Sequence, residues 1–231
     1  MKRAMGVALW VAAMMLLMLG LALLGFERMA LDWQRYDRYQ AQLELAPSVG
    51  VSEDALRDVQ KGVAGYLMGA LPADQMNHTV EMFGTEQSIF NEREMAHMVD
   101  VEALFRLERK VKLWSLGLGL VTLLGAMVVW RRGFRFAGLV ALGMWLWMAV
   151  TFAGANGFDF DRMFTRFHEL LFSNELWLLN PATDAMIRMY PIQFFEWMAR
   201  DIAVSMGLFA LVAVALPFLL ARKEGEQGDE L

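Results

Sequence analysis

Histidine is the residue type in this chain best suited to moving protons, because its side chain changes charge near neutral pH. There are three, His78, His97 and His168. There is no cysteine, which excludes a cysteine nucleophile, a disulfide and a thiolate metal site. His78 stands in a short polar stretch that predicts an exposed loop. The surroundings of His97 and His168 are more informative.

His97 belongs to a helical pattern with carboxylates on the same face. Glu94, His97 and Asp100 are spaced i, i+3 and i+6, which makes them neighbours on a helix surface. A carboxylate beside an imidazole orients the ring and raises its basicity, as a general base requires. A surface histidine on a charged helix fits the same spacing, so spacing alone leaves both interpretations open.

His168 shares its helical stripe with large apolar residues. Those residues are Phe164, Phe167, Leu171 and Phe172. A hydrogen-bonded core histidine explains this pattern, and so does a functional group held at a costly apolar position. A metal site from His97, His168, Asp100 and Asp184 also remains open, although the spacing of these ligands is unspecific.

The motifs of several enzyme classes are missing from the sequence. It contains no Gly-x-Ser-x-Gly elbow and no His-Glu-x-x-His zinc helix, and a serine triad is unsupported. The net charge of −5 gives no indication of a nucleic-acid partner. The hydrophobic share of 57% is high for a soluble domain and indicates a protein of the lipid bilayer.

Four apolar stretches have the length of a membrane-spanning helix, about 20 residues. We expect them at residues 4–26, 113–130, 136–155 and 202–221. Lys2 and Arg3 before the first stretch also fit a signal peptide. The stretch is long and ends in a poor cleavage site, so we predict an uncleaved helix.

Lysine and arginine near the helix ends predict the orientation. They precede the first helix, fill the turn between the second and third, and follow the fourth, at positions 2, 3, 131, 132, 135, 222 and 223. Both termini are therefore expected in the cytoplasm, with 222–231 as a cytoplasmic tail. Segments 27–112 and 159–201 then lie outside. A basic cluster at positions 106–112 lies on the outer side and argues against this orientation, but the rule is weaker in long segments.

Both outer segments have helical patterns. Ser52 and Asp161 are expected helix caps, Asn91 with Glu94 predicts a capping box, and Pro191 is expected as the first residue of a helix. No alternating strand pattern of useful length is present. The predicted fold class is an all-α membrane protein, with four transmembrane helices and a mostly helical extracellular cap.

Two motifs resemble those of one bacterial membrane-protein family, the lipoprotein intramolecular transacylases (Lit). The first is the run Phe90-Asn91-Glu92-Arg93-Glu94 with His97-Met98 and Asp100-Val101. The second comprises His168, Phe172, Asn174, Trp177, Asn180-Pro181, Asp184, Pro191 and Phe194-Phe195. The resemblance covers roughly residues 88–197 and the four-helix layout.

The resemblance implies an acyltransferase of the bacterial cell membrane that needs no cofactor or metal. Its partners would be the bilayer and diacylglyceryl-modified lipoproteins, whose middle acyl chain moves to the cysteine α-amine and gives the lyso form. The two catalytic histidines map onto His97 and His168, and their order as base and acid stays open. Expected substrate-binding or supporting residues are Asn91, Arg93, Glu94, Asp100, Asn174, Trp177, Asp184, Tyr190 and Phe194.

Two alternatives use the same residues. One is a membrane lipid hydrolase or a metal-dependent membrane enzyme built on the histidines. The other is a non-enzymatic protein that handles lipoproteins through its external segments.

Overall fold

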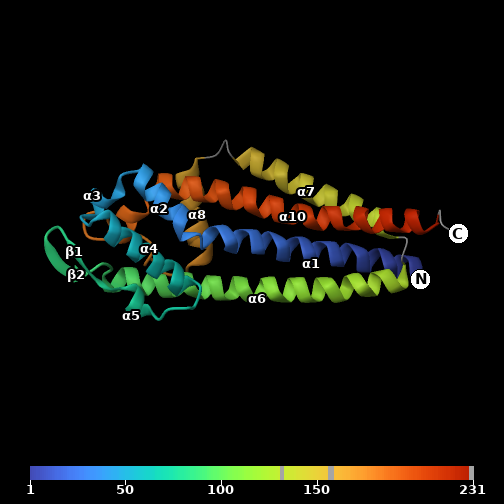
Figure 1. The fold of residues 1–231 in the computed structure, drawn as a ribbon, viewed down its shortest axis with the longest axis horizontal. Helices are drawn as coiled ribbons and strands as arrows, with labels where there is room; N and C mark the ends of the chain where they lie inside the picture. Colours follow the sequence, from blue (N-terminus) through green and yellow to red (C-terminus); the bar gives the residue numbers. More distant parts are fainter. Residues whose placement is uncertain (131–132, 156–158, 229–231) are drawn as a thin grey trace. The chain divides into compact units, whose positions relative to one another are not determined.

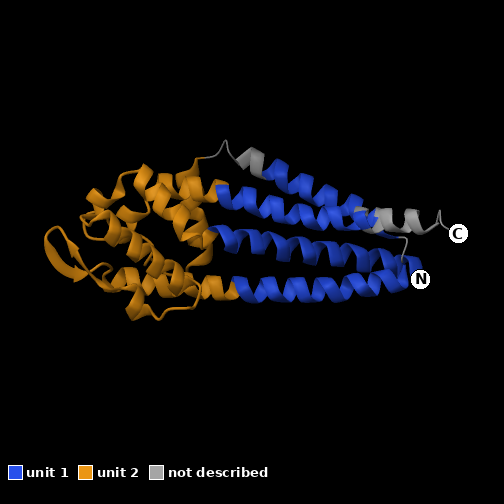
Figure 2. Ribbon diagram, viewed as in Figure 1, with its two compact units in different colours: residues 1–29, 108–158, 201–231 blue, residues 30–107, 159–200 orange. Residues whose placement is uncertain are grey.

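The computed structural model describes residues 1–130, 133–155 and 159–228. The chain divides into two compact units (Figure 2). Unit 1 comprises Met1–Met29, Glu108–Phe158 and Asp201–Leu231, and unit 2 comprises Ala30–Leu107 and Asp159–Arg200.

Unit 1 consists of long apolar helices, α1 (Lys2–Ala30), α7 (Phe134–Ala155) and the larger parts of α6 (Glu92–Val129) and α10 (Ile192–Gly228) (Figure 1). The core between these helices mixes several alanines with large residues such as Trp10, Met14 and Phe134. Small residues allow membrane helices to approach one another closely. At Gly25 an added Cβ would lie 2.7 Å from the carbonyl oxygen of Ser205 on α10. The Ser205 hydroxyl donates to the Gly25 carbonyl at 2.8 Å, so these two helices touch through backbone.

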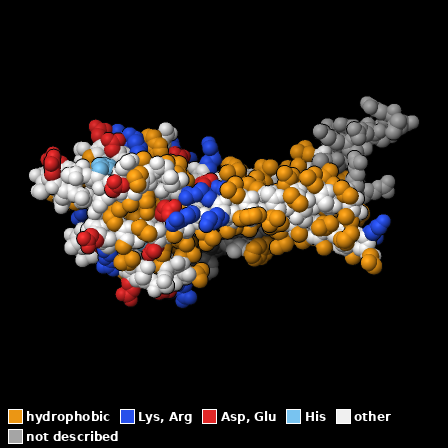
Figure 3. Space-filling model, turned by 90° about the horizontal axis from the view of Figure 1, so that it is seen from below, with side chains coloured by type: hydrophobic (Ala, Val, Ile, Leu, Met, Phe, Trp, Pro, Cys, Tyr) orange, Lys and Arg blue, Asp and Glu red, His pale blue; other side chains and the backbone are white. Residues whose placement is uncertain are grey.

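Among the described residues, α1, α6 and α10 are long and apolar enough to cross a membrane. The described apolar part of α7, Phe136–Thr151, is shorter. On the face that Figure 3 shows, many hydrophobic side chains lie on the surface of unit 1. The structure thus supports a multi-pass membrane protein, whereas the count of four spans and the orientation stay predictions. Arg131 and Arg132 lie outside the described residues, as do the side chains of residues 220–231.

Unit 2 packs short helices around a core of its own. Its elements are α2 (Trp33–Gln42), α3 (Leu45–Val49), α4 (Glu53–Leu67), α5 (Ala73–Met76), β1 (Thr79–Met82), β2 (Thr85–Ser88), α8 (Phe160–Leu171) and α9 (Ala185–Met189), with the first turns of α6 and α10. The apolar face of α4 supplies Leu56, Val59 and Val63 to this core, and Met98 joins it from α6.

Local capping sets where several of these helices begin. The Ser52 hydroxyl accepts from the Ala55 N–H and caps α4, as predicted. The expected cap at Asp161 is wrong, because Asp159 caps α8 by accepting from the Arg162 N–H. Pro191 lies one residue before α10.

The expectation of an all-α chain needs one correction, a β-hairpin. β1 and β2 pair antiparallel in the register Thr79↔Ser88 to Met82↔Thr85. The turn between them is Phe83-Gly84, and both residues have positive φ (51° and 80°), as a type I′ turn requires. Strands of four residues give little alternation to detect, and phenylalanine is not a typical first residue of such a turn.

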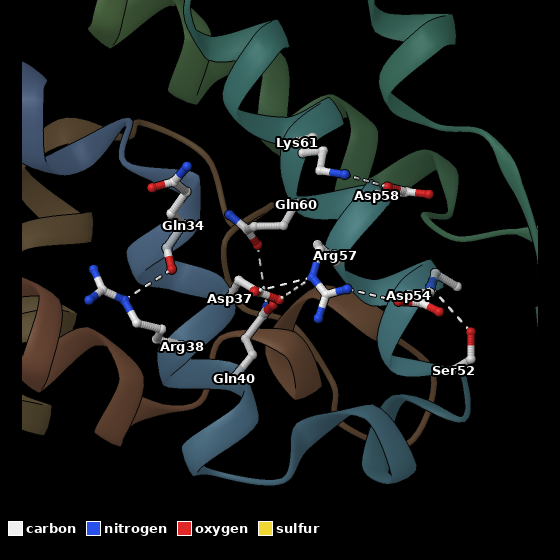
Figure 4. A network of polar contacts seen from close by, with 11 residues as sticks. Gln34, Asp37, Arg38, Gln40, Ser52, Asp54, Arg57, Asp58, Gln60 and Lys61 are labelled. Carbon is white, nitrogen blue, oxygen red and sulfur yellow. Dashed lines mark hydrogen bonds and ion pairs between the residues drawn. The ribbon is translucent and has the colours of Figure 1, made fainter.

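Residues 27–87 matched no recognised motif, and their part in unit 2 carries a buried polar network (Figure 4). The Gln40 amide donates to the Gln60 side-chain oxygen (3.3 Å) and to the Met189 carbonyl (3.2 Å), and the Tyr190 hydroxyl donates to the same oxygen of Gln60 (2.6 Å). α2 and α4 are therefore tied to the segment that leads into α10.

Candidate active site

The structure brings His97 and His168 together inside unit 2. His97 projects from the second turn of α6 and His168 from the third turn of α8. Their ring centroids are 6.3 Å apart and their planes are inclined by 35°. Both residues are buried, with exposed fractions of 7% and 9%.

The tautomer of the neutral His168 ring follows from a single contact. Its Nδ1 lies 2.8 Å from the Phe164 carbonyl oxygen, one helical turn earlier. A carbonyl only accepts hydrogen bonds, so Nδ1 carries the proton and Nε2 keeps its lone pair. Nε2 is thus the basic atom of the ring.

Aromatic rings enclose His168. Between ring centroids, Phe164 lies at 4.1 Å, Trp177 at 5.1 Å and Phe172 at 5.6 Å from His168. This burial lowers the pKa of His168, and the hydrogen bond to the Phe164 carbonyl partly offsets the effect by stabilising the charged form.

His97 has fewer hydrogen bonds than His168. Its ring meets the edge of Phe172 at 5.1 Å, and its buried Nδ1 forms no hydrogen bond within the part of the chain that the structure describes. The apolar stretch of α6 begins only after Lys112, so His97 lies outside the membrane-spanning part. Burial, together with the neighbouring His168, lowers the pKa of His97 to about 4, although Asp100 opposes the shift. Both imidazoles are therefore neutral at pH 7.

Glu94 does not serve as the orienting carboxylate of His97 that the helical spacing predicts. Its Oε2 accepts from the Asn91 N–H at 2.8 Å and the Asn91 side chain accepts from the Glu94 N–H at 3.0 Å, which confirms the capping box. Its Oε1 accepts from the Met186 N–H at 2.6 Å. Burial raises the pKa of Glu94 despite these two donors. The residue joins the start of α6 to α9.

Asp184 organises the loop before α9 together with Asn91. Asn91 Nδ2 donates to its Oδ1 at 2.9 Å, and the Asn180 N–H donates to its Oδ2 at 2.7 Å. Burial alone would raise the pKa of Asp184, but donation from Asn180, Thr183 and Asn91 outweighs it and the pKa is lowered. Asp184 is thus an anion held by its own hydrogen bonds.

Two further expected residues link α6 to the loop that follows α8. Asn174 Nδ2 donates to Asp100 Oδ2 at 2.9 Å, and Arg93 Nη2 donates to the Glu175 carbonyl at 2.8 Å. This loop carries Trp177, the ring that covers His168. Arg93 and Asn174 are exposed, so both remain within reach of a substrate.

Tyr190 and Phe194 lie one layer away from the histidines. Phe194 packs against Tyr36 and Tyr39 of α2, with centroids at 5.3 and 5.9 Å. The link to His168 runs through Phe195, which meets Phe164 at 4.9 Å. These two residues therefore support the wall of the site and do not contact the histidine pair.

Sequence reasoning missed Gln60, which holds the Tyr190 hydroxyl, and did not assign Phe172 to the site although its ring touches both histidines. A signal for Gln60 was present. It stands next to the apolar stripe of α4, where an amide must be buried and paired. In the described part of the chain, no three His, Asp or Glu side chains converge as a metal site would require.

Comparison with protein families is decisive at this point, because residues 10–195 match the model of the lipoprotein intramolecular transacylase Lit. The chain belongs to the Lit family. Transacylases are acyltransferases, so the predicted enzyme class is confirmed. Comparison with curated proteins returned no significant match.

Solved Lit structures from Bacillus cereus share the fold. One membrane-integral Lit has a TM-score of 0.77 at 15% identity, over 96% of this chain and 99% of the other. Two variants of that protein with a single histidine replaced, by alanine or by arginine, give TM-scores of 0.66 and 0.62 at 17% identity. The first covers 97% of each chain, and the second covers 98% of this chain and 95% of the other.

Proposed function

We propose that this Lit family member converts a diacylglyceryl-modified lipoprotein into its lyso form. The α-amine nitrogen of the lipidated cysteine attacks the carbonyl carbon of the middle glycerol ester. A C–N amide bond forms and the C–O ester bond breaks. The nitrogen starts as an ammonium and loses two protons, of which one ends on the glycerol oxygen and the other is released to water. Because both groups belong to one substrate molecule, no acyl-enzyme is needed.

The observation that carries this proposal is the pair of buried, neutral imidazoles. His168 Nε2 takes one proton from the ammonium and gives it to the departing oxygen, and the second proton of the nitrogen passes to water as the amide forms. It is the better base of the two, because its Nδ1–H bond to the Phe164 carbonyl stabilises the imidazolium. His97 stays neutral and donates a hydrogen bond to the oxyanion of the tetrahedral intermediate.

The aromatic enclosure supplies the second part of catalysis. Amine and ester stand at distant ends of one flexible lipid group, so the barrier contains a large cost of bringing them together. Holding both in place converts this encounter into a favourable intramolecular step. Phe164, Phe172 and Trp177 form an apolar wall that fits acyl chains.

We also propose a membrane topology that places this reaction on the same side of the membrane as its substrate. The fourth span is α7, both termini are cytoplasmic, and unit 2 lies on the outer side of a bacterial cell membrane. The three long apolar helices and the likeness to a membrane-integral Lit support this arrangement. A lipoprotein anchored in that membrane presents its ester and amine on the same side.

The experiment expresses the protein in a bacterial host without this activity and identifies lipoprotein N-termini by mass spectrometry. The wild type should produce the lyso form, and His97→Ala and His168→Ala should each abolish it. Arg38→Ala is the control, since Arg38 is exposed on α2 and bonds within its own helix, and it should act like the wild type. Full activity in both single variants would refute the catalytic roles.

A further inference from the structure

A pocket of about 430 Å³ lies in unit 2 beside the hairpin, and neither His97 nor His168 is among its lining residues. β1 forms one wall, with Thr79 and Glu81. The start of α4 and the loop before it form the other, with Gly50, Ser52 and Asp58. Ligand pockets commonly measure about 300–1,000 Å³.

The hydrogen-bond pattern of the hairpin shows where the backbone of β1 points. Met82 and Thr85 flank a two-residue turn and so form a hydrogen-bonded pair, after which bonded and non-bonded pairs alternate. The bond from the Ile89 N–H to the His78 carbonyl (3.4 Å) continues the same alternation. Thr79 and Glu81 therefore turn their N–H and C=O groups away from β2, on the side of the pocket.

One bond shows that this outer edge accepts a partner. Phe83 lies two residues after Glu81 and also points its N–H away from β2. This N–H donates to the Gly50 carbonyl at 2.8 Å. The outward groups of Thr79 and Glu81 form no such bond within the ranges that the structure describes. Gly50 thus pairs with the outer edge of the hairpin at the turn, and the pocket lies along the remainder of that edge, beside Thr79 and Glu81.

The opposite wall has few polar groups left to offer. The Ser52 hydroxyl caps α4 through the Ala55 N–H, and Asp58 pairs with Lys61 at 2.8 Å, both drawn in Figure 4. The repeated backbone donors and acceptors of β1 are therefore the distinctive recognition groups of the pocket. Repeating groups at strand spacing match the backbone of another extended chain.

We propose that this edge of β1 binds an extended polypeptide as an added strand, and that the polypeptide is the stretch of the lipoprotein that follows its lipidated cysteine. The inference rests on the proposed function and adds the part of the substrate that the histidines do not touch. Backbone pairing tolerates any side chain except proline, so it suits substrates defined by their lipid.

The pocket and the histidines are joined by a short, rigid path. The Asn77 side chain accepts from the Phe90 N–H and donates to the Phe90 carbonyl, both at 2.9 Å, which fixes the hairpin to the start of α6. His97 lies five residues after Glu92, about 8 Å along the helix at 1.5 Å per residue. An extended chain covers about 3.3 Å per residue, so a twelve-residue peptide spans about 40 Å and can extend past the start of α6 toward β1, whereas a two-residue peptide spans about 7 Å.

The test compares synthetic diacylglyceryl lipopeptides with two and with twelve residues on the full-length protein in lipid nanodiscs. Wild-type kcat/KM should be higher for the long substrate. Glu81→Pro removes one outward N–H from β1 and should lower kcat/KM about two- to tenfold for the long substrate only, as expected for one lost hydrogen bond. Ala55→Phe places a large side chain in the pocket and leaves the sequence of the hairpin unchanged. It should have the same selective effect.

Glu86→Pro is the matched control. Glu86 stands directly opposite Glu81, and its N–H points away from the ladder in the same way, toward the other edge of the hairpin. It should leave both substrates unaffected. Equal losses in the Glu81 and Glu86 variants, or a wild type indifferent to length, would overturn the inference.

A binding measurement separates this inference from the proposed function. A photo-reactive residue in place of Ala55 should crosslink an N-acetylated twelve-residue lipopeptide, which cannot react at its amine, and the same residue in place of Gln87 on β2 should not. If the short substrate is not converted, the proposed function fails, whatever the crosslinking result. If it is converted and Ala55 captures nothing, only the strand-binding inference fails.

Discussion

At the scale of single residues, burial works against protonation of the site. Moving an imidazole out of water penalises its charged form, so His97 and His168 remain neutral below the pH at which exposed histidines become charged. Each can therefore accept a proton transiently, and neither holds it at rest. This state fits a reaction that begins and ends with a neutral base.

The pH dependence of kcat/KM follows from these shifts. In the proposed reaction, the reacting pair is a neutral His168 and an α-ammonium group of pKa about 7.7–8.0. Its population is constant between the lowered pKa of His168 and that of the amine. We expect a plateau from about pH 7.5 to below 6.5, the ordinary histidine value, and a fall at lower pH. A rate that instead drops tenfold per unit below pH 7.7 would mean that free amine reacts without a base. Initial rates with a lipopeptide in nanodiscs provide the profile.

Phe172 should control the acidic end of that profile, because its ring covers both histidines. Phe172→Ala admits water and should return both pKa values toward 6.5, which moves the fall in activity to higher pH. Phe160→Ala is the control, since Phe160 contacts Phe164 but neither histidine. A loss of activity with an unchanged profile would assign Phe172 to substrate binding instead.

At the scale of elements, the site depends on how α6 is attached to its neighbours. Glu94 accepts one backbone N–H from its own helix start and one from α9. Asp100 and Arg93 attach the loop after α8. The helix with one histidine is thus fixed to the segments that cover the other.

Glu94→Gln tests this attachment. The amide offers one acceptor where two are needed and places its NH₂ group against a backbone N–H. A buried unsatisfied donor costs about 1–3 kcal/mol, so thermal unfolding should begin several degrees lower. Glu92→Gln, an exposed change two residues earlier, should leave the midpoint unaltered. Equal midpoints for the two variants would contradict the role given to Glu94. Scanning calorimetry in detergent provides the comparison.

The features that could be predicted from the sequence are the local ones. The Ser52 cap and the Asn91–Glu94 capping box depend on residues three apart, and both are present. The bond from Met186 to Glu94 joins positions 92 residues apart, and no local pattern encodes it. The same limit applies to Gln60 with Tyr190. Aspartate is a good helix cap at either position 159 or 161. Which of the two caps α8 depends on where the helix begins, and tertiary packing decides that.

At the scale of the whole molecule, a buried charge cluster joins two of the apolar helices of unit 1. Lys112 on α6 bonds to Glu27 on α1 and lies 3.6 Å from Glu108, one turn earlier. Lys112 is 6% exposed. Charges at such a position are tolerated only when they are paired.

Lys112→Met should destabilise the protein, by up to about 3–5 kcal/mol, because it leaves the partly buried carboxylates of Glu27 and Glu108 without their cation. Lys110→Met, an exposed change on the same helix, should have little effect. Adding Glu27→Gln to Lys112→Met should recover part of the loss by removing one uncompensated charge. Urea or thermal unfolding in detergent measures the series, and similar stabilities for the two lysine variants would contradict the pairing.

The contact between His168 and the Phe164 carbonyl has a consequence for how the site tolerates change. Every amino acid carries a main-chain carbonyl, so no side-chain exchange at position 164 removes the acceptor that fixes the tautomer. The ring at 164 can vary in size while the basic nitrogen of His168 stays the same atom. The choice of basic nitrogen is thereby independent of the side chain at position 164. Under the proposed function, acyl-chain preference could be redesigned at this position without moving the base to another atom.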